Sequence, residues 1–372
     1  MDRFAAFYFR KTQTQEILTL EDLRKEIDQL DNQLLEILNQ RMEVVRRVGK
    51  LKRSNNSVIY RPEREKSIIE RLDKRNKGLL NKAAIEAIFL EIFAISRNLE
   101  LPELVAYLGP EGSFTHQAAE SRFGAMSEYM ALDSINAVFR ALETKRTRYG
   151  VVPLENNQEG IVGETIDQLG KTGLKIIAEI CLPIHFGFGT KAEKLSEVTK
   201  IYSKDIAFRQ CRKFMNESFN PKEVEMIPVN STSKAVRIAM EDPNSGAICS
   251  HIAAKLYNLP ILFDNIEDSE DNFTRFLILS HDVKNQKSAN DKTTFLAKSS
   301  DKPGSLAHLL QDFYEAGINL TKIESRPAKK GKNFKYYFYI DIDGHIDDEN
   351  VNDVVSRHKK DLLWLGSYAK MC

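Results

Sequence analysis

The chain reads TLEDLRKEIDQLDNQLLEILNQRMEVVRRVGKLKR over residues 19–53, and its apolar residues recur at steps of three and four. That spacing places them on one face of an α-helix. Thr19 followed by Asp22 is a capping-box start, and the run holds no Pro and a single Gly. We predict one helix from Leu20 to about Arg53, ~50 Å long at ~1.5 Å per residue and well beyond an ordinary globular helix.

Two further helices follow the long one. Pro62 stands at a first helical position, with Glu63 and Glu65 favouring that end. A third helix is predicted from about Asn81 to Glu100, ending before a proline. Residues 19–101 therefore form an all-α unit, and residues 1–18 are an N-terminal extension.

The rest of the chain changes pattern twice. Residues 103–282 alternate short apolar strands with helices, which predicts an α/β fold with largely parallel sheets. We expect two lobes around a cleft, one from about 103–181 plus 263–282 and one from about 182–262. A polar linker, 283–292, leads to residues 293–372, whose β-α-β-β-α-β order is ferredoxin-like.

Composition excludes several classes of function. The 372 residues carry a formal net charge of +1, so no basic field favours nucleic acid, and no apolar run approaches a membrane span. The four cysteines are scattered, so we expect neither a metal site nor a disulfide framework, and we expect a cytoplasmic location. We predict no cofactor, and we interpret His185 and His251 as structural or exposed.

The helical segment carries cations at suggestive spacing. Arg41 and Lys52 are eleven residues apart, ~16 Å of rise and three turns, so they lie on nearly one face. Their side chains could converge on one small dianion. Arg24 lies ~25 Å from Arg41 along the helix, so a second chain must supply it if all three share a site. The alternative is a set of solvated charges on an amphipathic bundle.

Residues 23–28, 35–41, 49–52 and 60–65 together resemble the all-helical class of chorismate mutases in motif and in spacing. The resemblance implies an intertwined dimer in which the long helix crosses into the partner's site. It assigns the carboxylates of chorismate to Arg24 of the other chain, Arg41 and Arg64, the ether oxygen to Lys52, and the ring hydroxyl to Glu65 with Ser96 close by. These residue types suit a Claisen rearrangement, which needs the substrate held in its reactive conformer and donors aimed at the growing charge.

Glu100 departs from that family's pattern, in which some members have Gln. An ionised carboxylate cannot donate a hydrogen bond to the ether oxygen. We therefore expect that Glu100 assists only when protonated, that mutase activity falls as pH rises, and that Glu100→Gln flattens the profile.

The stretch Asn272–Phe276 places a hydroxyl and a guanidinium where a loop enters an apolar strand. With residues 109–115, 151–163 and 231–235 it resembles prephenate dehydratase, in that family's order. The resemblance implies two lobes similar to type II periplasmic binding proteins, and it makes Thr274 the proton donor to the departing ring hydroxyl. The expected substrate-binding residues are Ser113, Thr115, Glu155, Asn156, Ser231, Asn272, Arg275 and Phe276. Lys204 and Ile206 stand where that family commonly has His and Gln.

The last segment resembles a regulatory ACT domain at residues 303–306 and 323–327. The resemblance implies phenylalanine bound at a dimer interface. The residues expected there are Gly304, Ser305, Leu306, Glu324, Ser325 and Arg326. Alternatively, Glu324 and Arg326 organise the loop without touching the amino acid.

Nearly the full length thus resembles the bifunctional chorismate mutase–prephenate dehydratases. The expected partners are chorismate, prephenate and the inhibitor phenylalanine, in a homodimer or tetramer, with no nucleic acid and no membrane. Two other classes of protein fit parts of this pattern. One is a non-catalytic sensor made of a binding-protein-like cleft and an ACT domain, and the other is a structural protein that dimerises through a coiled coil.

Overall fold

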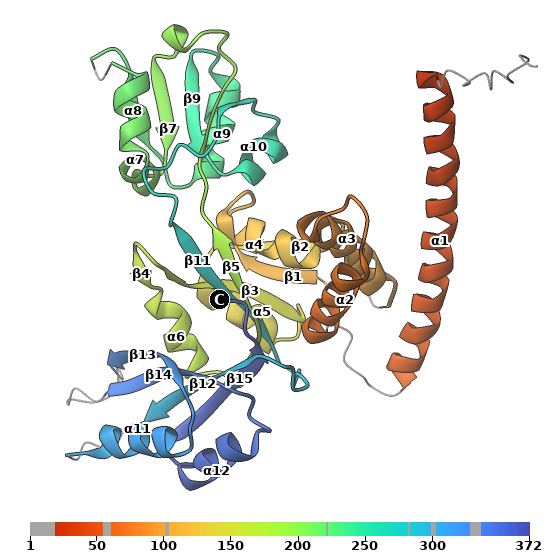
Figure 1. Ribbon diagram of the computed structural model, residues 1–372. Helices are drawn as coiled ribbons and strands as arrows, with labels where there is room; N and C mark the ends of the chain where they lie inside the picture. Colours follow the sequence, from red (N-terminus) through yellow and green to blue (C-terminus); the bar gives the residue numbers. More distant parts are fainter. Residues whose placement is uncertain are drawn as a thin grey trace, which may run out of the picture.

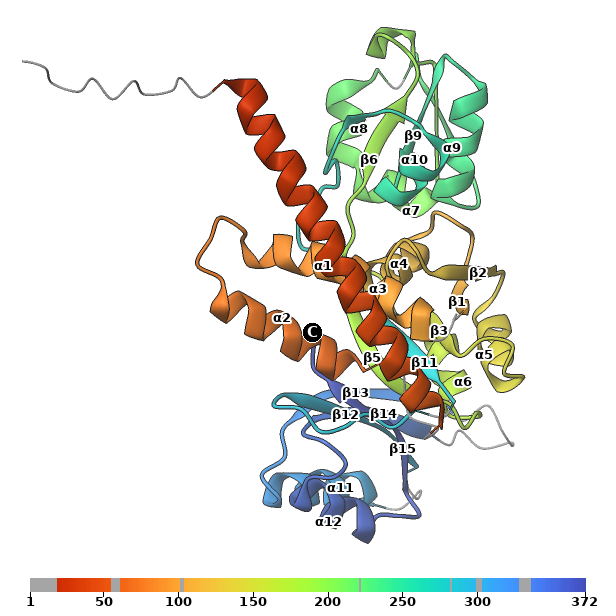
Figure 2. The same ribbon diagram turned by 90° about the vertical axis from the view of Figure 1, so that its right-hand side faces the viewer.

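The computed structural model describes residues 19–54, 61–100, 104–220, 222–281, 283–298, 303–327 and 336–372. The expected N-terminal extension and the predicted boundary at residues 101–103 lie outside these ranges. Figures 1 and 2 show a helical part, a two-lobed α/β part and a smaller α/β part below it. The predicted multidomain architecture is confirmed at this level.

The three predicted helices are present: α1 (Leu20–Ser54), α2 (Pro62–Arg75) and α3 (Lys82–Glu100). The Thr19 side chain accepts a hydrogen bond from the Asp22 amide (3.2 Å) and donates one to the Asp22 carboxylate (2.5 Å), so the start of α1 is capped reciprocally. The helix packs against α3 within this chain. Its other end stands clear of the remaining elements (Figures 1 and 2).

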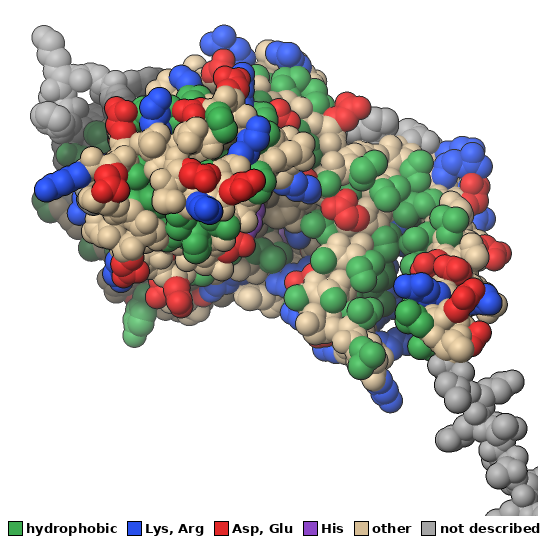
Figure 3. All heavy atoms as spheres, turned by 90° about the horizontal axis from the view of Figure 1, so that it is seen from above, with side chains coloured by type: hydrophobic (Ala, Val, Ile, Leu, Met, Phe, Trp, Pro, Cys, Tyr) green, Lys and Arg blue, Asp and Glu red, His purple; other side chains and the backbone are tan. Residues whose placement is uncertain are grey.

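An apolar face runs along α1 without cover from its own chain. Leu34 is 55% exposed and Leu51 is 65% exposed. The other large apolar side chains exposed on this helix are Leu20, Leu23, Ile27, Leu30, Leu35, Ile37, Val44 and Val48. Seen from above, hydrophobic side chains gather over the helical part, whereas the upper lobe shows mixed charges (Figure 3). A contiguous apolar stripe of this size marks a surface that packs against another body.

The first lobe is built on a sheet in the order β2-β1-β3-β11-β5, with β4 paired to β3. Its strands are β1 (Leu104–Leu108), β2 (Glu128–Leu132), β3 (Tyr149–Asn156), β4 (Gly160–Ile161), β5 (Lys175–Pro183) and β11 (Phe273–Ser280). The helices are α4 (Phe114–Phe123), α5 (Ile135–Glu143) and α6 (Gly163–Leu169). β11 runs antiparallel to both β3 and β5, so this sheet is mixed.

The second lobe is a sheet in the order β10-β6-β9-β7-β8. Its strands are β6 (Gly187–Thr190), β7 (Lys200–Ser203), β8 (Glu225–Pro228), β9 (Ser245–Cys249) and β10 (Ile261–Phe263). Its helices are α7 (Asp205–Gln210), α8 (Arg212–Ser218), α9 (Thr232–Glu241) and α10 (His251–Tyr257), with a short 3₁₀ turn at Leu195–Glu197. The chain crosses between the lobes twice, after β5 and before β11 (Figure 1).

The third part has the predicted order: β12 (Asp291–Lys298), α11 (Ser305–Glu315), β13 (Leu320–Pro327), β14 (Tyr336–Asp343), α12 (Glu349–Arg357) and β15 (Leu362–Ala369). Its antiparallel sheet runs β13-β14-β12-β15. β15 lies against β5, where a Cβ on Gly366 would collide with the backbone oxygen of Ile176. Tyr339 and Tyr368 share one buried cluster with Ile176 and Leu277, so one core spans both parts.

The cysteine prediction is wrong in one respect. Cys181 on β5 and Cys372 at the end of the chain form a disulfide, with their Cα atoms 5.7 Å apart. The two residues are 191 positions apart in the sequence, and the packing of β15 on β5 brings them together. Local spacing carries no signal for such a pair. Cys211 and Cys249 are free and buried.

Among the described residues, no helix is both long enough and apolar enough to cross a bilayer.

Candidate functional sites

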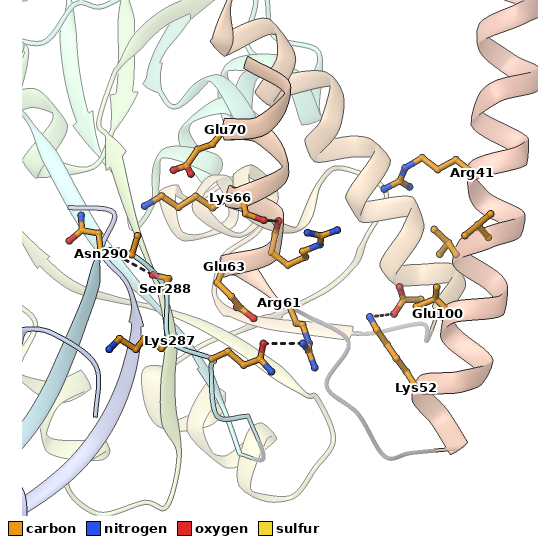
Figure 4. A pocket seen from close by; sticks show the side chains of 17 residues that line it. Arg41, Lys52, Arg61, Glu63, Lys66, Glu70, Glu100, Lys287, Ser288 and Asn290 are labelled. Atoms are coloured by element: carbon orange, nitrogen blue, oxygen red, sulfur yellow. Dashed lines mark hydrogen bonds and ion pairs between the residues drawn. The ribbon is translucent and has the colours of Figure 1, made fainter. Parts of the chain in front are cut away.

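A cavity of about 1020 Å³ opens between α1, α2 and residues 286–290 (Figure 4). Arg41 and Lys52 line it from α1, Arg64 from α2, and Glu100 from the end of α3. Helical periodicity predicted that Arg41 and Lys52 lie on one face of the helix, and in the structure both cations line the same cavity. Both side chains point from α1 toward the other helices in the close-up view.

Arg41 is held by α3. Its guanidinium donates to Ser96 Oγ at 2.6 Å and lies 5.9 Å from the centre of the Phe93 ring. Burial lowers the pKa of Arg41 and the charge of Glu100 opposes that shift. A guanidinium stays charged under such a shift, so the cavity keeps a fixed cation at this wall.

Lys52 and Glu100 form an ion pair at 2.7 Å across the same cavity. Glu100 is only 8% exposed, so its carboxylate has little access to water. Lys52, which is expected to donate to the ether oxygen of chorismate, is therefore already hydrogen-bonded to Glu100. A bound substrate would have to share Lys52 with Glu100 or displace that bond.

Two predicted residues lie away from this cavity in the single chain. Arg24 is exposed, and it is ~25 Å from Arg41 along α1. Glu65 hydrogen-bonds Arg97, whose guanidinium also donates to the backbone oxygen of Phe123 at 2.9 Å. Glu65 thus faces α3 and α4, on the wall of a separate cavity of about 380 Å³.

Two residues of this region were missed by sequence reasoning. Arg97 is 5% exposed and stands between Ser96 and Asn98 on α3, so the local sequence gives no signal that it is buried. Glu63 lines the large cavity, and burial raises the pKa of its carboxyl. Charged side chains are rarely buried without a partner, so the charges of Arg97 and Glu63 must be accommodated by the residues around them.

The second candidate site lies at one edge of the first lobe's sheet. The register pairs Thr274 with Asn156 and Phe273 with Pro183, so the end of β3, the end of β5 and the start of β11 meet there. β1 runs parallel to β3, which brings residues after Leu108 to the same edge. In open α/β sheets the carboxyl ends of strands are the usual position of ligands.

Thr274 lies inside β11, which begins at Phe273, and not in the loop that the sequence indicated at Asn272–Phe276. Asn156 Nδ2 lies 2.9 Å from Thr274 Oγ1 and 2.8 Å from Asn272 Oδ1. Asn156 Oδ1 accepts from the amides of Gln158 and Glu159 at 2.9 Å each. These four contacts fix the orientation of the Asn156 amide, with its nitrogen toward Thr274.

Gln210 joins this cluster from the second lobe. Its Oε1 accepts from Asn272 Nδ2 at 3.2 Å, and its Nε2 donates to Gln158 at 3.3 Å. Gln210 is the last residue of α7, and sequence reasoning missed it because that helix was not predicted. Lys204 precedes the same helix without a side-chain cap, and Ile206 lies in its first turn.

Three predicted substrate-binding residues lie elsewhere. Arg275 and Glu155 pair at 3.2 Å and face the third domain, as described below. Phe276 is 2% exposed and belongs to the core of the first lobe. Successive side chains of a strand point to opposite faces, so a three-residue motif on β11 could not place all its members on the Thr274 side.

Two of the expected substrate-binding residues, Ser113 and Ser231, cap helices at the lobe junction. Ser113 Oγ accepts from the His116 amide at the start of α4, and Ser231 Oγ accepts from Lys234 at the start of α9. Thr115 is buried in the first turn of α4. Ser250 Oγ donates to the backbone oxygen of Gly112 at 2.8 Å, so the loop before α4 touches the second lobe.

The histidines make local pairs. His185 Nδ1 lies 2.6 Å from Glu267, and His251 Nε2 lies 3.0 Å from Asp264. His116, which sequence reasoning did not single out, accepts the Gly112 amide at 3.2 Å and stacks on Tyr107, and burial lowers its pKa. No cluster of three potential metal ligands occurs among the described residues.

The expected regulatory residues lie on two elements of the third domain. Gly304 has φ +81° and precedes α11, with Ser305 as the first helical residue and Leu306 next. Glu324, Ser325 and Arg326 lie on β13. Arg326 Nε is 3.8 Å from Asp167 of α6, so this motif reaches the α/β part.

Three family models match the chain in succession: Chorismate mutase type II over residues 23–101, Prephenate dehydratase over 105–284, and ACT domain over 293–358. A bifunctional chorismate mutase/prephenate dehydratase of Aquifex aeolicus is 43% identical, covering 94% of this chain and 98% of that protein. One from Pseudomonas aeruginosa is 37% identical over the same shares. The structure of a prephenate dehydratase from Arthrobacter aurescens in complex with L-Phe is 30% identical with a TM-score of 0.65, covering 72% of this chain and 90% of that one.

Proposed function

The chain belongs to the bifunctional chorismate mutase/prephenate dehydratase family, and from that premise we propose which of its residues carry each reaction. It converts chorismate to prephenate and prephenate to phenylpyruvate, in the synthesis of phenylalanine. The comparisons do not favour a non-catalytic sensor, since relatives that span all three segments bear the names of both enzymes. We also retain the cytoplasm as the proposed location.

For the mutase reaction, Arg41 and Arg64 hold the two carboxylates of chorismate in the cavity between α1 and α2. Lys52 donates to the ether oxygen, where negative charge grows as the C–O bond breaks. The rearrangement needs no nucleophile and no net proton transfer, so positioning and fixed positive charge supply the catalysis. The convergence of Arg41, Lys52 and Arg64 on one cavity supports this assignment.

The mutase site is completed by a second copy of the chain. Arg24 cannot reach the cavity of its own chain, because ~25 Å of rigid helix separates it from Arg41. The exposed apolar stripe of α1 gives a surface for a partner, and an antiparallel crossing of two such helices would bring each Arg24 to the other's cavity. We therefore propose a dimer at minimum, with Ser96 holding the Arg41 guanidinium in position.

For the dehydratase reaction, Thr274 donates a proton to the ring hydroxyl of prephenate as carbon dioxide leaves. The observation that carries this proposal is the bond from Asn156 to Thr274 Oγ1. Because the oxygen accepts from an amide whose orientation is fixed, its own O–H is free to donate to the substrate. The orientation of the prephenate carboxylates is assigned to Ser113, Thr115, Ser231, Asn272 and Gln210.

Phenylalanine is proposed to bind the third domain through Gly304–Leu306 and Glu324–Arg326. The solved relative holds L-Phe, and this chain carries an ACT domain match. Product binding would stabilise an arrangement in which the dehydratase cleft is less competent.

The test is to supply chorismate to the full chain and follow prephenate and phenylpyruvate, with and without phenylalanine. Thr274→Ala should accumulate prephenate, with dehydratase kcat at least ~10²-fold lower because the proton donor is gone. Thr274→Ser is the matched control, since it keeps the hydroxyl. Retention of wild-type phenylpyruvate formation by Thr274→Ala would refute the assignment.

A further inference from the structure

The strand that carries Thr274 presents its next residue to a different domain. In the pairing of β11 with β3, Thr274 lies opposite Asn156 and Arg275 lies opposite Glu155. Neighbouring residues of a strand point to opposite faces. The Thr274–Asn156 pair therefore contains the proposed proton donor, and the adjacent Arg275–Glu155 pair faces the ACT domain.

Arg275 bridges the two domains with a buried guanidinium. On the dehydratase side it lies 3.2 Å from Glu155 and 2.8 Å from Glu179 of β5. On the ACT side it donates to Asp341 of β14 at 2.7 Å and to Tyr368 of β15 at 3.1 Å. Its side chain is 8% exposed, so water cannot replace a lost partner.

The surrounding charges extend this bridge in both directions. Lys292 of β12 pairs with Glu179 at 2.8 Å, and Lys322 of β13 pairs with Glu155. Three cations thus meet three carboxylates, so this network carries no net formal charge. Two of the three carboxylates lie on the strands that flank β11: Glu155 on β3 and Glu179 on β5. Arg275 itself lies on β11. The third carboxylate, Asp341, belongs to the ACT domain.

The proposed amino-acid site connects to the same network. Lys322, Glu324 and Arg326 alternate along β13, and these three residues are the less exposed ones in that stretch. Residues two apart on a strand share a face. A shift of β13 on binding an amino acid would therefore move Lys322 and with it Glu155, the neighbour of Asn156.

We propose that Arg275 is a positioning residue, which couples the placement of the ACT domain to the orientation of the Thr274 hydroxyl. The inference rests on the proposed function of Thr274 and deepens it by naming the route of regulation. In one arrangement of the ACT domain the Arg275–Glu155 rung is held as described and Thr274 is aligned with Asn156. In the second arrangement of the ACT domain, Asp341 moves away from Arg275 and Lys322 moves away from Glu155. The Arg275–Glu155 pair and the adjacent Thr274–Asn156 pair then shift together.

The experiment measures dehydratase kinetics on prephenate, with increasing phenylalanine, in full-length Arg275→Gln, Arg275→Lys and Lys322→Gln. The mutase activity of each variant serves as an internal check of folding. We expect Arg275→Gln to lower kcat about 10- to 100-fold with KM changed less than ~3-fold, because alignment rather than substrate binding is lost. Arg275→Lys should recover part of kcat, since it keeps the charge but not the fork of donors.

Phenylalanine sensitivity gives the second readout. Both Arg275→Gln and Lys322→Gln should raise the half-inhibiting phenylalanine concentration at least ~5-fold, the lower end of typical allosteric coupling. Lys175→Gln is the matched control: Lys175 crosses the same interface to the Trp364 carbonyl at 2.5 Å, at the far end of β5 from Thr274. It should keep wild-type kcat and wild-type inhibition.

The inference is overturned if folded Arg275→Gln keeps wild-type kcat and inhibition, as a merely structural clamp would. It is also overturned if Lys175→Gln has the same effect as Arg275→Gln, because interface integrity alone would then explain both. If Arg275→Gln loses mutase activity through misfolding, Lys322→Gln decides alone, and its wild-type inhibition refutes the coupling. Failure of the function itself would show separately, as an active Thr274→Ala.

Discussion

The cavity between α1 and α2 collects its cations from helix faces, whereas the site at the edge of β1, β3 and β11 collects its groups from strand ends. In the helical site, residues at fixed spacing converge because a helix repeats every 3.6 residues. In the sheet site, Asn156 and Thr274 meet although 118 positions separate them. The first site lacks Arg24 within one chain, whereas the second has the proposed proton donor, Thr274, already bonded to the Asn156 amide.

The difference has a physical basis in how each reaction is served. A rearrangement of a dianion depends on fixed charges, which rigid helices can supply even across a subunit boundary. Proton donation depends on the direction of one O–H bond, which a hydrogen-bonded ladder controls closely. We therefore expect small shifts of strand register to affect the dehydratase site, and association of chains to affect the mutase site.

The largest expected effect tests whether the mutase site is shared between chains. Arg24→Ala and Lys52→Ala should each lower mutase kcat/KM by at least ~10³-fold, since each removes a cation from the transition state. Mixed dimers of the two variants should recover about a quarter of the activity, because half of the dimers hold one intact site. Dehydratase rates on added prephenate should not change.

Lys25→Ala is the control for that experiment, as an exposed neighbour of Arg24 whose charge lies near Glu21. It should retain full mutase activity. Mixed dimers that recover nothing, although both variants associate, would show that the helical site is contained in one chain and would break the comparison.

The next effect sharpens the account of the sheet site. Asn156→Ala should lower dehydratase kcat about 10²-fold, because Thr274 loses the donor that fixes its oxygen. Asn156→Asp should be at least as impaired, since a carboxylate accepts the Thr274 proton instead of leaving it for the substrate. Steady-state kinetics on prephenate measure both, with Asn220→Ala on the surface of the second lobe as control. Wild-type turnover in Asn156→Asp would contradict the proposed orientation.

A smaller effect concerns pH and the helical site. Glu100→Gln should flatten the dependence of mutase kcat/KM on pH, because a neutral amide keeps a hydrogen-bond donor toward the ether oxygen at every pH. The Gln variant also removes the ion pair between Lys52 and Glu100, in which the two side chains lie 2.7 Å apart. The dehydratase profile of the same variant provides the control. An unchanged mutase profile would refute the role of Glu100.

The smallest effect compares how acid acts on the two regions. Burial opposes ionisation of both Glu155 and Glu179. The charge of Lys322 outweighs burial at Glu155, and the charges of Arg275 and Lys292 outweigh it at Glu179. The pKa values of both carboxyls therefore lie below the ordinary range. Their contribution to stability is present above the ordinary Glu pKa of ~4.3 and is lost as pH falls through the lowered values. Glu63 has the opposite sign: its raised pKa means that stability declines as pH rises through the window above ~4.3.

Thermal unfolding followed between pH 7 and pH 3 measures this contrast. The midpoint of the ACT–dehydratase part should fall by a few degrees on acidification, on the scale of ~2–4 °C per kcal/mol for parts of this size. Glu63→Gln should raise the midpoint slightly at neutral pH and leave it unchanged in acid. A lower midpoint for Glu63→Gln at neutral pH would contradict the sign given to its burial.

Local pattern predicted the helical and regulatory parts well. The bounds of α1 and the order of β12 to β15 were recovered because they depend on periodicity, caps and breakers close in sequence. Several strands of the two lobes were missed, including β2 and β8. Their residues are largely exposed or half-buried, so they lack the continuous apolar runs by which strands are recognised.

The site residues divide along the same line. Arg41 and Lys52 were correctly expected to face one space, since helical spacing alone dictates it. The motif at residues 274–276 was treated as one group, yet its members point to the cleft, to the ACT domain and into the core. The pairing of Glu65 with Arg97 and the Cys181–Cys372 disulfide likewise join residues that no spacing rule connects.

The sequence by itself determined the three segments, their element order in the helical and regulatory parts, and the residues proposed for the two reactions. These follow from interactions within a few residues of one another. Only the tertiary structure decided that Asn156 orients Thr274, that Arg275 belongs to the interface and not to the cleft, and that the chain's end is tied to β5. Strand register and domain packing set those contacts, and both arise from burying distant parts of the chain against each other.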